Sequence, residues 1–512
     1  MGSKRSFTGS WANAPDPIDE GQIVQIENSD IVVCGAGISG VACALRAAQI
    51  GASVVVLEKS GNWSGRGGNI GVPNSSFMKE NGYENDLEEI AREWIKRCCN
   101  RCDEEILWRY LNNGARVMDW LVDIVTAPEY GARAALQGGF YRGETYLEVV
   151  GSHRFFDGPM AKKGARPGGA DAVFAMYSES LKLGVRYYFN TPALQLCKED
   201  GRVTAVFAQT DSGIMRANAA KGVVLATGDI GGNEEMCEEL SPIANKTAAK
   251  LYTPKGGNEG DGHRMGYWVG GDFEDDPFPC ILHPQAFHFS NYCFLFVGPD
   301  GKRFMNEDSF VQGKSIAVIR KGFTYAWAIA DSDWATKVPQ TLPYGGGLFW
   351  GHDCEMGDSG FDIEHEKGSF ERGLNRGVVV KADTPEELAE KMGVPVDEFV
   401  KTFDKYAKIT AEGKDDEFGK RKELLLPLDK PPYYAMKFGP ALLGVAGGLR
   451  VNTKMNVLDE DRTPIEGLYA VGNAAGGMYG VDYPILIAGN RHGSALTLGY
   501  LVGEELGESS SF

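Results

Sequence analysis

The sequence predicts an α/β fold on the strength of three stretches. Residues 30–58 read as strand, helix and second strand, residues 222–233 as an apolar strand that ends in a glycine-rich turn, and residues 467–477 as another strand of that kind. Continuous apolar runs of strand length are typical of a parallel sheet with helices on both faces. We therefore expect a parallel sheet whose strands end at glycine-rich turns.

The first stretch carries a dinucleotide fingerprint. An apolar run leads into GAGISG at residues 35–40, a helix-like segment follows, and a second apolar run ends at Glu58. Gly35 permits a tight turn, Gly37 lets the backbone approach a pyrophosphate at the helix N-terminus, and Gly40 lets helix and strand pack closely. Glu58 can accept a hydrogen bond from a ribose hydroxyl. These features predict a bound dinucleotide; a glycine-rich turn without a ligand is the alternative.

A long loop and a helical layer come next. Residues 60–71 are rich in Gly, Ser and Asn, and they would lie at the carboxyl ends of the strands, where open α/β sheets bind ligands. Residues 85–125 have apolar residues at helical spacing, which predicts packed helices. A helix to about Leu183, a strand from Val185 and a hairpin around residues 199–201 are expected to follow.

The later segments divide the chain. The glycines of residues 226–232 let the backbone pass close to a ligand. Between residues 281 and 445 the βαβ periodicity stops, and a helical stretch runs from Pro385 to about Ala411. A strand and a glycine-rich loop resume at residue 467, and the final helix begins in residues 489–496, where free amides suit a carbonyl or a phosphate. We predict an arm (1–28), a nucleotide-binding domain in two parts (29–280 and 446–512) and an inserted domain (281–445).

Composition excludes several classes. The 512 residues carry a net charge of -18, which argues against nonspecific nucleic-acid binding. The sequence contains no run of eighteen apolar residues, so no membrane span is predicted. Ten scattered cysteines suggest buried thiols in a reducing compartment. Cys98, Cys99 and Cys102 form one cluster without a second at ligand spacing, so we expect incidental thiols rather than an iron–sulfur or zinc site, and no metal. The N-terminus has no apolar export segment, which favours the cytoplasm, with export by a removed leader left open.

In this order the segments resemble the flavoprotein family of soluble fumarate reductases, urocanate-type reductases and 3-ketosteroid dehydrogenases. The resemblance rests on GAGISG with Glu58, the loop through Gly71, VVLATGDIGGN, GKRFMNE at residues 301–307, GLYAVGNAAGG and the last helix start. It implies a Rossmann-like FAD-binding domain of glutathione-reductase type with an inserted α+β capping domain. Family members with covalent flavin carry a histidine in the loop after the second strand. Residues 60–71 contain none, so non-covalent FAD is expected.

The motifs and the resemblance together single out the residues expected to bind the cofactor. They are Gly35, Ala36, Gly37, Ser39, Gly40, Glu58, Lys59, Ser64, Gly67, Gly68, Asn69, Gly71, Ala226, Thr227, Gly228, Asn233, Asp261, Gly472, Asn473, Gly489, Ser494, Ala495 and Leu496.

The resemblance also implies a substrate side. Hydride passes between flavin N5 and a double bond polarised by a carbonyl or carboxylate, and a protein acid handles the proton. His283, before a proline at the start of the capping domain, and Arg491, in the last glycine-rich segment, match the fumarate-type carboxylate ligands. The alternatives are a packing histidine and an arginine that contacts only flavin or a surface acid.

Two departures from the fumarate pattern matter. No arginine follows Asn306-Glu307 within residues 308–312, and Gly444-Val445-Ala446 stands where a second histidine would precede Gly447-Gly448. Fumarate is therefore not the expected substrate. Tyr483, before a proline, resembles the ketone-binding tyrosine of the steroid branch, which makes Tyr483 and Tyr479 candidates for carbonyl polariser or proton donor, with aromatic lining as the alternative. His492 is a candidate proton shuttle.

These observations lead to one functional hypothesis with two rivals. We expect an FAD-dependent oxidoreductase that reduces a carbon–carbon double bond conjugated to a carbonyl or carboxylate; the rivals are a ketosteroid-type dehydrogenase and a non-redox flavin protein or isomerase. One dinucleotide fingerprint is visible, so electrons are expected from a separate donor. Aromatic residues in 278–296, 325–327 and 344–350 suggest a bulky, flat unsaturated acid or ketone, although core packing explains them equally well.

Overall fold

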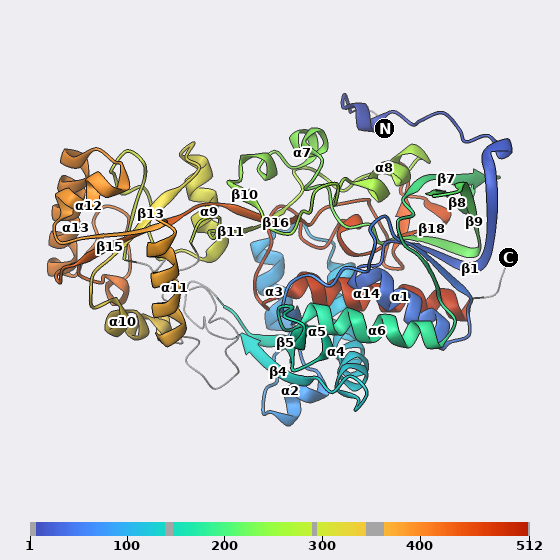
Figure 1. Cartoon of the computed structure of the whole chain (residues 1–512), viewed down its shortest axis with the longest axis horizontal. Helices are drawn as coiled ribbons and strands as arrows, with labels where there is room; N and C mark the ends of the chain where they lie inside the picture. Colours follow the sequence, from blue (N-terminus) through green and yellow to red (C-terminus); the bar gives the residue numbers. More distant parts are fainter. Residues whose placement is uncertain (1–6, 139–146, 289–293, 345–362, 510–512) are drawn as a thin grey trace.

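The computed structural model describes residues 7–138, 147–288, 294–344 and 363–509 (Figure 1). The larger body, on the right of Figure 1, contains both chain ends and a sheet with helices packed against it, and the smaller body on the left is formed by the middle of the chain. The aromatic residues proposed at 289–293 and 345–350 lie outside the described residues. In the four described ranges, no helix is both long enough and apolar enough to traverse a bilayer.

Parallel strands at the centre of the larger body end together. β1 (Ile23–Cys34) pairs in parallel with β2 (Val54–Leu57) and β9 (Gly213–Leu225), and β9 pairs with β18 (Pro464–Ala470). The register places Cys34 opposite both Leu57 and Leu225, and Leu225 opposite Ala470. Every glycine-rich turn named above therefore leaves the sheet at one edge. This edge is where ligands bind in open α/β sheets.

The remaining strands extend this sheet. β6 (Arg186–Tyr188) follows β2 in parallel, and β7 (Ala193–Glu199), β8 (Arg202–Thr210) and β17 (Asn456–Leu458) are antiparallel. The hairpin predicted around residues 199–201 is thus confirmed. β1 begins at Ile23, so the last residues assigned to the arm belong to the sheet, because they pair with the first half of β9. Residues 213–221, the first half of β9, contain polar residues, so they do not form the continuous apolar run by which a buried strand is predicted.

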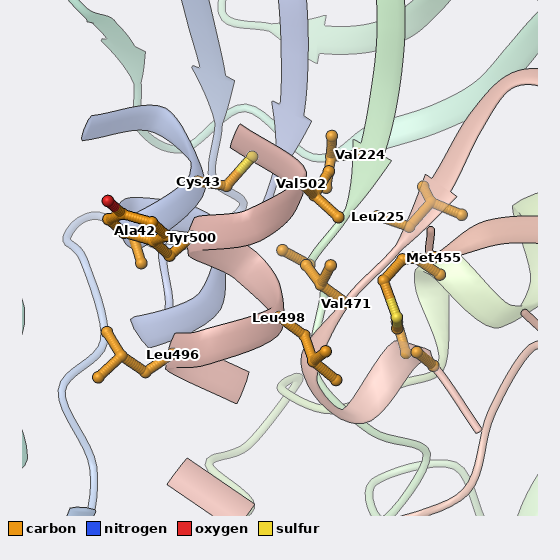
Figure 2. Packing of buried hydrophobic residues seen from close by; sticks show 14 of the residues in the cluster. Ala42, Cys43, Val224, Leu225, Met455, Val471, Leu496, Leu498, Tyr500 and Val502 are labelled. Carbon is orange, nitrogen blue, oxygen red and sulfur yellow. The ribbon is translucent and has the colours of Figure 1, made fainter. Parts of the chain in front are cut away.

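Two helices pack on each other against this sheet. α1 (Ile38–Gln49) and α14 (Asn490–Glu508) cross where glycines allow close approach: a Cβ on Gly499 or Gly503 would lie 2.3 Å from the carbonyl oxygen of Ser39 or Cys43. Figure 2 shows Tyr500 of α14 beside Ala42 of α1, and Val502 facing Val224 of β9. α6 (Gly169–Lys182) also packs against α1.

A helical layer and a small sheet complete the larger body. The region predicted as helical at 85–125 is two helices, α3 (Leu87–Arg97) and α4 (Glu104–Thr126), separated by a turn in which Cys99 and Asn100 have φ of 53° and 56°. The remaining elements are α2 (Ser76–Glu80), β3 (Ile70–Gly71), β4 (Arg133–Gly138), β5 (Val150–Phe156), α5 (Pro159–Lys162), α7 (Glu234–Leu240) and α8 (Asp261–Trp268).

The smaller body has its own apolar core, drawn from residues 294–438. Four antiparallel strands form its sheet: β12 (Leu295–Val297), β13 (Ala326–Ala330), β15 (Tyr433–Phe438) and β14 (Val379–Ala382). The helices of this body are α10 (Trp334–Lys337), α11 (Ile363–Asn375), α12 (Pro385–Met392) and α13 (Val396–Glu412), and α9 (Val311–Arg320) contacts residues 280–283. The single helix predicted from Pro385 is two helices, because Gly393 has φ of 71° and ends the first. A three-stranded sheet of β10 (Ala249–Lys250), β16 (Ala441–Val445) and β11 (Cys280–His283) lies between the bodies (Figure 1).

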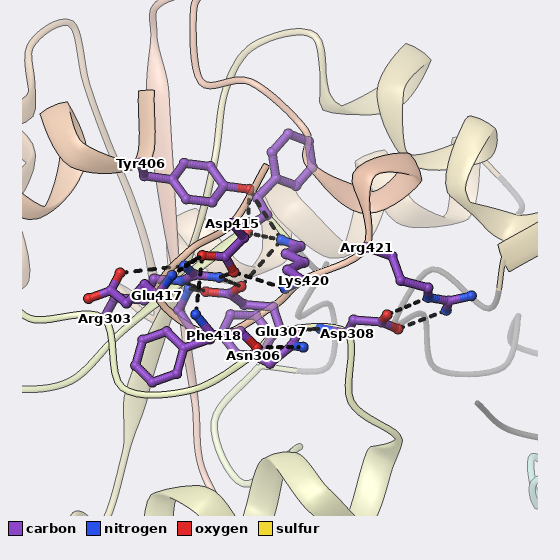
Figure 3. A network of polar contacts seen from close by, with 12 residues as sticks. Arg303, Asn306, Glu307, Asp308, Tyr406, Asp415, Glu417, Phe418, Lys420 and Arg421 are labelled. Atoms are coloured by element: carbon purple, nitrogen blue, oxygen red, sulfur yellow. Dashed lines mark hydrogen bonds and ion pairs between the residues drawn. The ribbon is translucent and has the colours of Figure 1, made fainter. Parts of the chain in front are cut away.

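A buried ion network stabilises the smaller body (Figure 3). Arg303 donates to Glu307 at 2.7 Å and to Asp415 at 2.8 Å, and the Nζ of Lys420 lies 3.4 Å from Glu307. Although burial opposes ionisation, Lys420 and Arg303 lower the pKa of Glu307. The network ties the GKRFMNE segment to the chain that follows α13, so this motif has a structural role in the fold.

Candidate active site

A cavity of about 530 Å³ opens at the carboxyl edge of the central sheet. The strand ends at Cys34 and Leu57 line it, together with Ala226, which follows β9, and residues of the loop 60–71. Residues of the sheet between the two bodies, Ile281 and His283 of β11 among them, form another wall. Both parts of the nucleotide-binding body and the start of the inserted segment thus meet at one site.

The GAGISG turn has the geometry that its glycines predict. Gly35 has φ of 109°, and a Cβ there would lie 2.3 Å from the carbonyl oxygen of Ala226. A Cβ on Gly40 would lie 2.0 Å from the carbonyl oxygen of Gly35. In contrast, a Cβ on Gly37 would meet nothing within 4 Å, although Gly37 lines the cavity at the N-terminus of α1. The open space at a helix N-terminus suits a pyrophosphate.

The acidic residue of the fingerprint is held in place by the chain. Glu58 accepts hydrogen bonds from the backbone N–H groups of Ala36 and Ser60, both at 2.8 Å. A carboxylate oxygen accepts more than one hydrogen bond, so Glu58 can also receive a ribose hydroxyl. Lys59 lines the same cavity but is paired with Asp261 at 2.7 Å.

The glycine-rich loop packs against the start of α14. The Nδ1 of His492 lies 2.9 Å from the carbonyl oxygen of Asn69, and a Cβ on Gly67 would lie 2.4 Å from the imidazole ring. Within the described chain, the buried Oδ1 of Asn69 has no hydrogen-bond partner, although Asn69 lines the cavity. A buried acceptor without a partner is costly unless a ligand satisfies it.

Most of the predicted cofactor residues lie at the cavity. Those that line it are Gly35, Gly37, Ser39, Glu58, Lys59, Ser64, Gly67, Gly68, Asn69, Ala226, Thr227, Gly228, Asp261, Gly472, Asn473, Gly489 and Ala495. Ala36, Gly40, Gly71, Asn233, Ser494 and Leu496 are outside this lining. Asn233 caps α7 instead, since its side chain accepts from the N–H of Met236 at 3.0 Å.

The two candidate tyrosines have different surroundings. Tyr483 lines the cavity, and its hydroxyl oxygen accepts the backbone N–H of Arg491 at 3.3 Å. Burial raises the pKa of Tyr483, so its hydroxyl keeps its proton at neutral pH. Tyr479 is outside the cavity lining: its hydroxyl lies 3.0 Å from the Oδ1 of Asn490 and its ring stacks on Trp94. The structure therefore does not bring Tyr479 to the site as a proton donor.

Arg491 lines the cavity, yet its side chain is largely engaged by the protein. Its Nη2 donates to the carbonyl oxygens of Gly472 at 2.7 Å and Ala475 at 3.3 Å, and its Nε donates to Asn473. The fork with which an arginine binds a carboxylate is thus used to hold the loop of residues 472–475.

Both histidines of the cavity are neutral at physiological pH. Burial, aided by the charge of Arg166, lowers the pKa of His283 to about 3, and burial also lowers the pKa of His492. The amide nitrogen of Gln285 lies 3.4 Å from the Nδ1 of His283. A neutral imidazole can orient a ligand by hydrogen bonding, but it is a poor general acid.

The cavity also contains eight polar residues that the sequence motifs did not single out: Ser60, Arg66, Arg166, Asp229, Tyr252, Lys255, Asn258 and Gln285. Asp229 is buried and accepts from the N–H of Gly231 at 2.7 Å, and burial raises its pKa. Arg66 donates to the side-chain oxygen of Asn258 at 3.1 Å. Three of them, Arg66, Arg166 and Asp229, lie in the glycine-rich segments SGRGGN (64–69), ARPGG (165–169) and ATGDIGG (226–232).

The fold and this cavity define a dinucleotide-binding protein whose ligand site is shared with an inserted domain. A model of the FAD binding domain family matches residues 30–484, and the chain belongs to that family. The predicted family and α/β fold class are thereby confirmed. The fingerprint turn, the held Glu58 and the unsatisfied Asn69 fit FAD.

Similar proteins include both reductases and dehydrogenases. The chain is 28% identical to the vinyl phenol reductase of Lactiplantibacillus plantarum over 89% of this chain and 92% of that protein. It is 28% identical to the urocanate reductase of Eggerthella lenta over 88% of this chain and 71% of that protein. A flavocytochrome c3 fumarate reductase structure matches with a TM-score of 0.70 and 24% identity, covering 98% of this chain and 82% of that one, which shows the shared fold. The chain is an FAD-dependent oxidoreductase.

Proposed function

We propose that this enzyme reduces a carbon–carbon double bond conjugated to a carbonyl or carboxylate group, with FAD held non-covalently. The observation that carries the proposal is the position of Tyr483, whose protonated hydroxyl lines the same cavity as the dinucleotide fingerprint. When bound, FAD supplies hydride exchange with an electron-poor carbon. The similarity to enzymes named vinyl phenol reductase and urocanate reductase supports this reaction class.

A residue of the protein supplies the proton that the reaction requires besides the hydride. The hydroxyl oxygen of Tyr483 accepts the N–H of Arg491, so its proton is left to be donated in another direction, toward the cavity. That N–H also stabilises the phenolate that forms when the proton leaves. Tyr483 is therefore our candidate proton donor, and the neutral His283 and His492 are assigned to orienting substrate and cofactor.

Residues at the cavity would hold FAD without a covalent bond. Gly37 at the N-terminus of α1 would bind the pyrophosphate of FAD, and Glu58 would bind its ribose. The loop containing Gly67 and Asn69 would bind the rest of the cofactor. The loop of residues 60–71 contains no histidine for covalent attachment. Denaturation in acid should therefore release free FAD, and flavin that stays with the precipitated protein would contradict this part of the proposal.

Anaerobic stopped-flow spectroscopy tests the reaction. Photoreduced holoenzyme should be reoxidised by members of a panel of 2-enoates and enones, and a panel that leaves the flavin reduced would refute the proposal. Reduction of the oxidised enzyme by a saturated ketone would instead favour the dehydrogenase direction. An electron donor is expected to be a separate protein or dye, so NADH alone should reduce the flavin slowly.

Substitution Tyr483→Phe tests the proton donor. Loss of the general acid should slow reoxidation by about 10²–10⁴-fold, with FAD content unchanged. Tyr479→Phe is the matched control, because it removes a hydroxyl that hydrogen-bonds Asn490 behind the cavity, and its rate should stay within a few fold of the wild type. Equal rates for Tyr483→Phe and the wild type would remove Tyr483 from the reaction.

A further inference from the structure

The segment that carries Tyr483 closes on the start of α14 through two hydrogen bonds. The hydroxyl oxygen of Tyr483 accepts the N–H of Arg491 at 3.3 Å, and the carbonyl oxygen of Pro484 accepts the side-chain amide of Asn490 at 2.9 Å. The first bond is long for an N–H···O contact, whereas the second has the ordinary length. The segment is therefore held more firmly at Pro484 than at the Tyr483 hydroxyl.

Asn490 is placed behind the cavity to hold Pro484. It is fully buried as the first residue of α14, and it is outside the lining of the cavity, although Gly489 and Arg491 on either side of it line the cavity. Its Oδ1 accepts the hydroxyl of Tyr479 at 3.0 Å, and its Nδ2 donates to Pro484. Both ends of the amide thus bind the protein itself rather than a ligand.

The bond to Pro484 constrains Tyr483 through the main chain. The peptide bond between these two residues is planar, and the proline ring fixes the φ of residue 484. A proline also restricts the backbone of the residue before it. The ring of Tyr483 is buried against that of Tyr479, with 5.3 Å between the ring centroids. Once the carbonyl of Pro484 is fixed, these restraints place the Tyr483 hydroxyl beside the N–H of Arg491.

We propose that Asn490 is a positioning residue for proton donation: its amide holds Pro484, and through Pro484 it keeps the Tyr483 hydroxyl at the N-terminus of α14. This inference rests on the proposed function. A group that is displaced by about 1 Å from its reacting geometry can lose about 100-fold in rate. Because Asn490 is outside the cavity lining, its effect on the reaction passes through Tyr483.

A double-mutant cycle tests this route. Asn490→Ala should slow reoxidation of the reduced holoenzyme by about 10–100-fold at a saturating concentration of the best enoate or enone, with full FAD content and the substrate Kd within about threefold of the wild type. In the Tyr483→Phe background the same substitution should slow the reaction by less than about threefold, because the hydroxyl that it positions is already absent. Equal factors in the two backgrounds, or loss of FAD from Asn490→Ala, would overturn the inference.

Matched variants separate the hydrogen bond from packing. Asn490→Leu fills a similar volume without an amide and should be as slow as Asn490→Ala; a wild-type rate in Asn490→Leu would show that packing alone suffices and would refute the positioning role. Asn245→Ala is the control, because the Nδ2 of Asn245 donates to the carbonyl oxygen of Glu234 at 2.8 Å, outside the cavity lining. It removes the same kind of bond and should react as the wild type.

Fluorine NMR observes Tyr483 without any turnover. In enzyme labelled with 3-fluorotyrosine, the resonance of residue 483 is the one that disappears in Tyr483→Phe. Asn490→Ala should shift and broaden this resonance, because the ring then takes more than one position, and Asn245→Ala should leave it unchanged. A resonance that keeps its position and width in Asn490→Ala would contradict the inference.

Failure of the inference and failure of the proposed function give different results. Reduced wild-type enzyme that no enoate or enone reoxidises refutes the proposed function, and the fluorine spectrum then decides by itself whether Asn490 positions Tyr483. Turnover that Asn490→Ala slows by the same factor with and without the Tyr483 hydroxyl refutes the inference and leaves double-bond reduction intact.

Discussion

A single buried carboxyl group joins two segments at the back of the site. Glu274 accepts the N–H of Gly448 at 2.9 Å and that of Gly477 at 2.8 Å. Both of these segments follow the inserted domain in the sequence, whereas Glu274 precedes it. Burial raises the pKa of Glu274 to about 7, although both N–H groups oppose that shift. The group is therefore half ionised near physiological pH.

This pKa predicts how stability depends on pH. A carboxyl group whose pKa is higher in the folded state binds more protons there, so its contribution is complete below pH 4.5 and is lost as the pH rises through about 7. The loss is on the order of 3 kcal/mol. Glu274→Gln, which cannot ionise, should lower Tm at pH 5 because one N–H loses its acceptor, and it should flatten the decline in Tm between pH 5 and pH 8. Thermal unfolding followed by circular dichroism measures both effects.

The control for this prediction is a carboxyl group whose ionisation is favoured by surface partners. Glu398 pairs with Lys302 and Lys401 on the inserted domain, and these lysines lower its pKa. Glu398→Gln should leave the slope of Tm between pH 5 and pH 8 unchanged. A Glu274→Gln variant with the slope of the wild type would show that another group is responsible.

At the scale of single elements, the GAGISG segment between β1 and α1 contains two glycines that are required for different physical reasons. Gly40 is glycine because the chain itself occupies the place of a side chain, 2.0 Å from the carbonyl oxygen of Gly35. Gly37 is glycine although the chain leaves open space there. The first therefore serves packing, and the second serves a ligand.

Substitution by valine separates these two roles. Gly40→Val forces α1 away from β1 and should yield unfolded or insoluble protein, because a backbone contact cannot move aside. Gly37→Val should fold with the far-UV spectrum of the wild type and lose at least tenfold in FAD content, measured by flavin absorbance after purification. A Gly37→Val protein with full flavin would contradict the placement of the pyrophosphate at α1.

At the scale of the whole molecule, the protein has two separate apolar cores, one in each body. One core fills the larger body, and the other is confined to residues 294–438 of the inserted domain. Each body could therefore lose its structure in a separate transition, as proteins with two cores often do. The buried network around Arg303 belongs only to the second core (Figure 3).

Removing one charge from that network should destabilise one body selectively. Glu307→Gln removes the buried carboxylate that pairs with Arg303 and Lys420 and should cost the inserted domain roughly 3–5 kcal/mol. Tryptophan fluorescence, with Trp327 and Trp334 in that core, should show an early transition in guanidinium chloride, while the visible circular dichroism of the flavin persists to higher concentration. The same Glu398→Gln variant serves as the exposed control, and coincident loss of both signals in Glu307→Gln would show that the bodies unfold as one.

The sequence by itself determined the sheet and the cofactor side of the site, because these depend on local signals. Apolar strand runs, the spacing of three glycines and Glu58 act within about thirty residues, and the structure places Gly35, Gly37, Gly40 and Glu58 as that spacing requires. Only the tertiary structure decided which side chains are available to the proposed substrate. Whether Arg491 keeps its donors for a ligand depends on carbonyl groups and side chains brought near by folding, and Tyr479 and Tyr483 differ in the same way. Sequence patterns report which groups a chain carries, but the partners that occupy those groups come from distant segments.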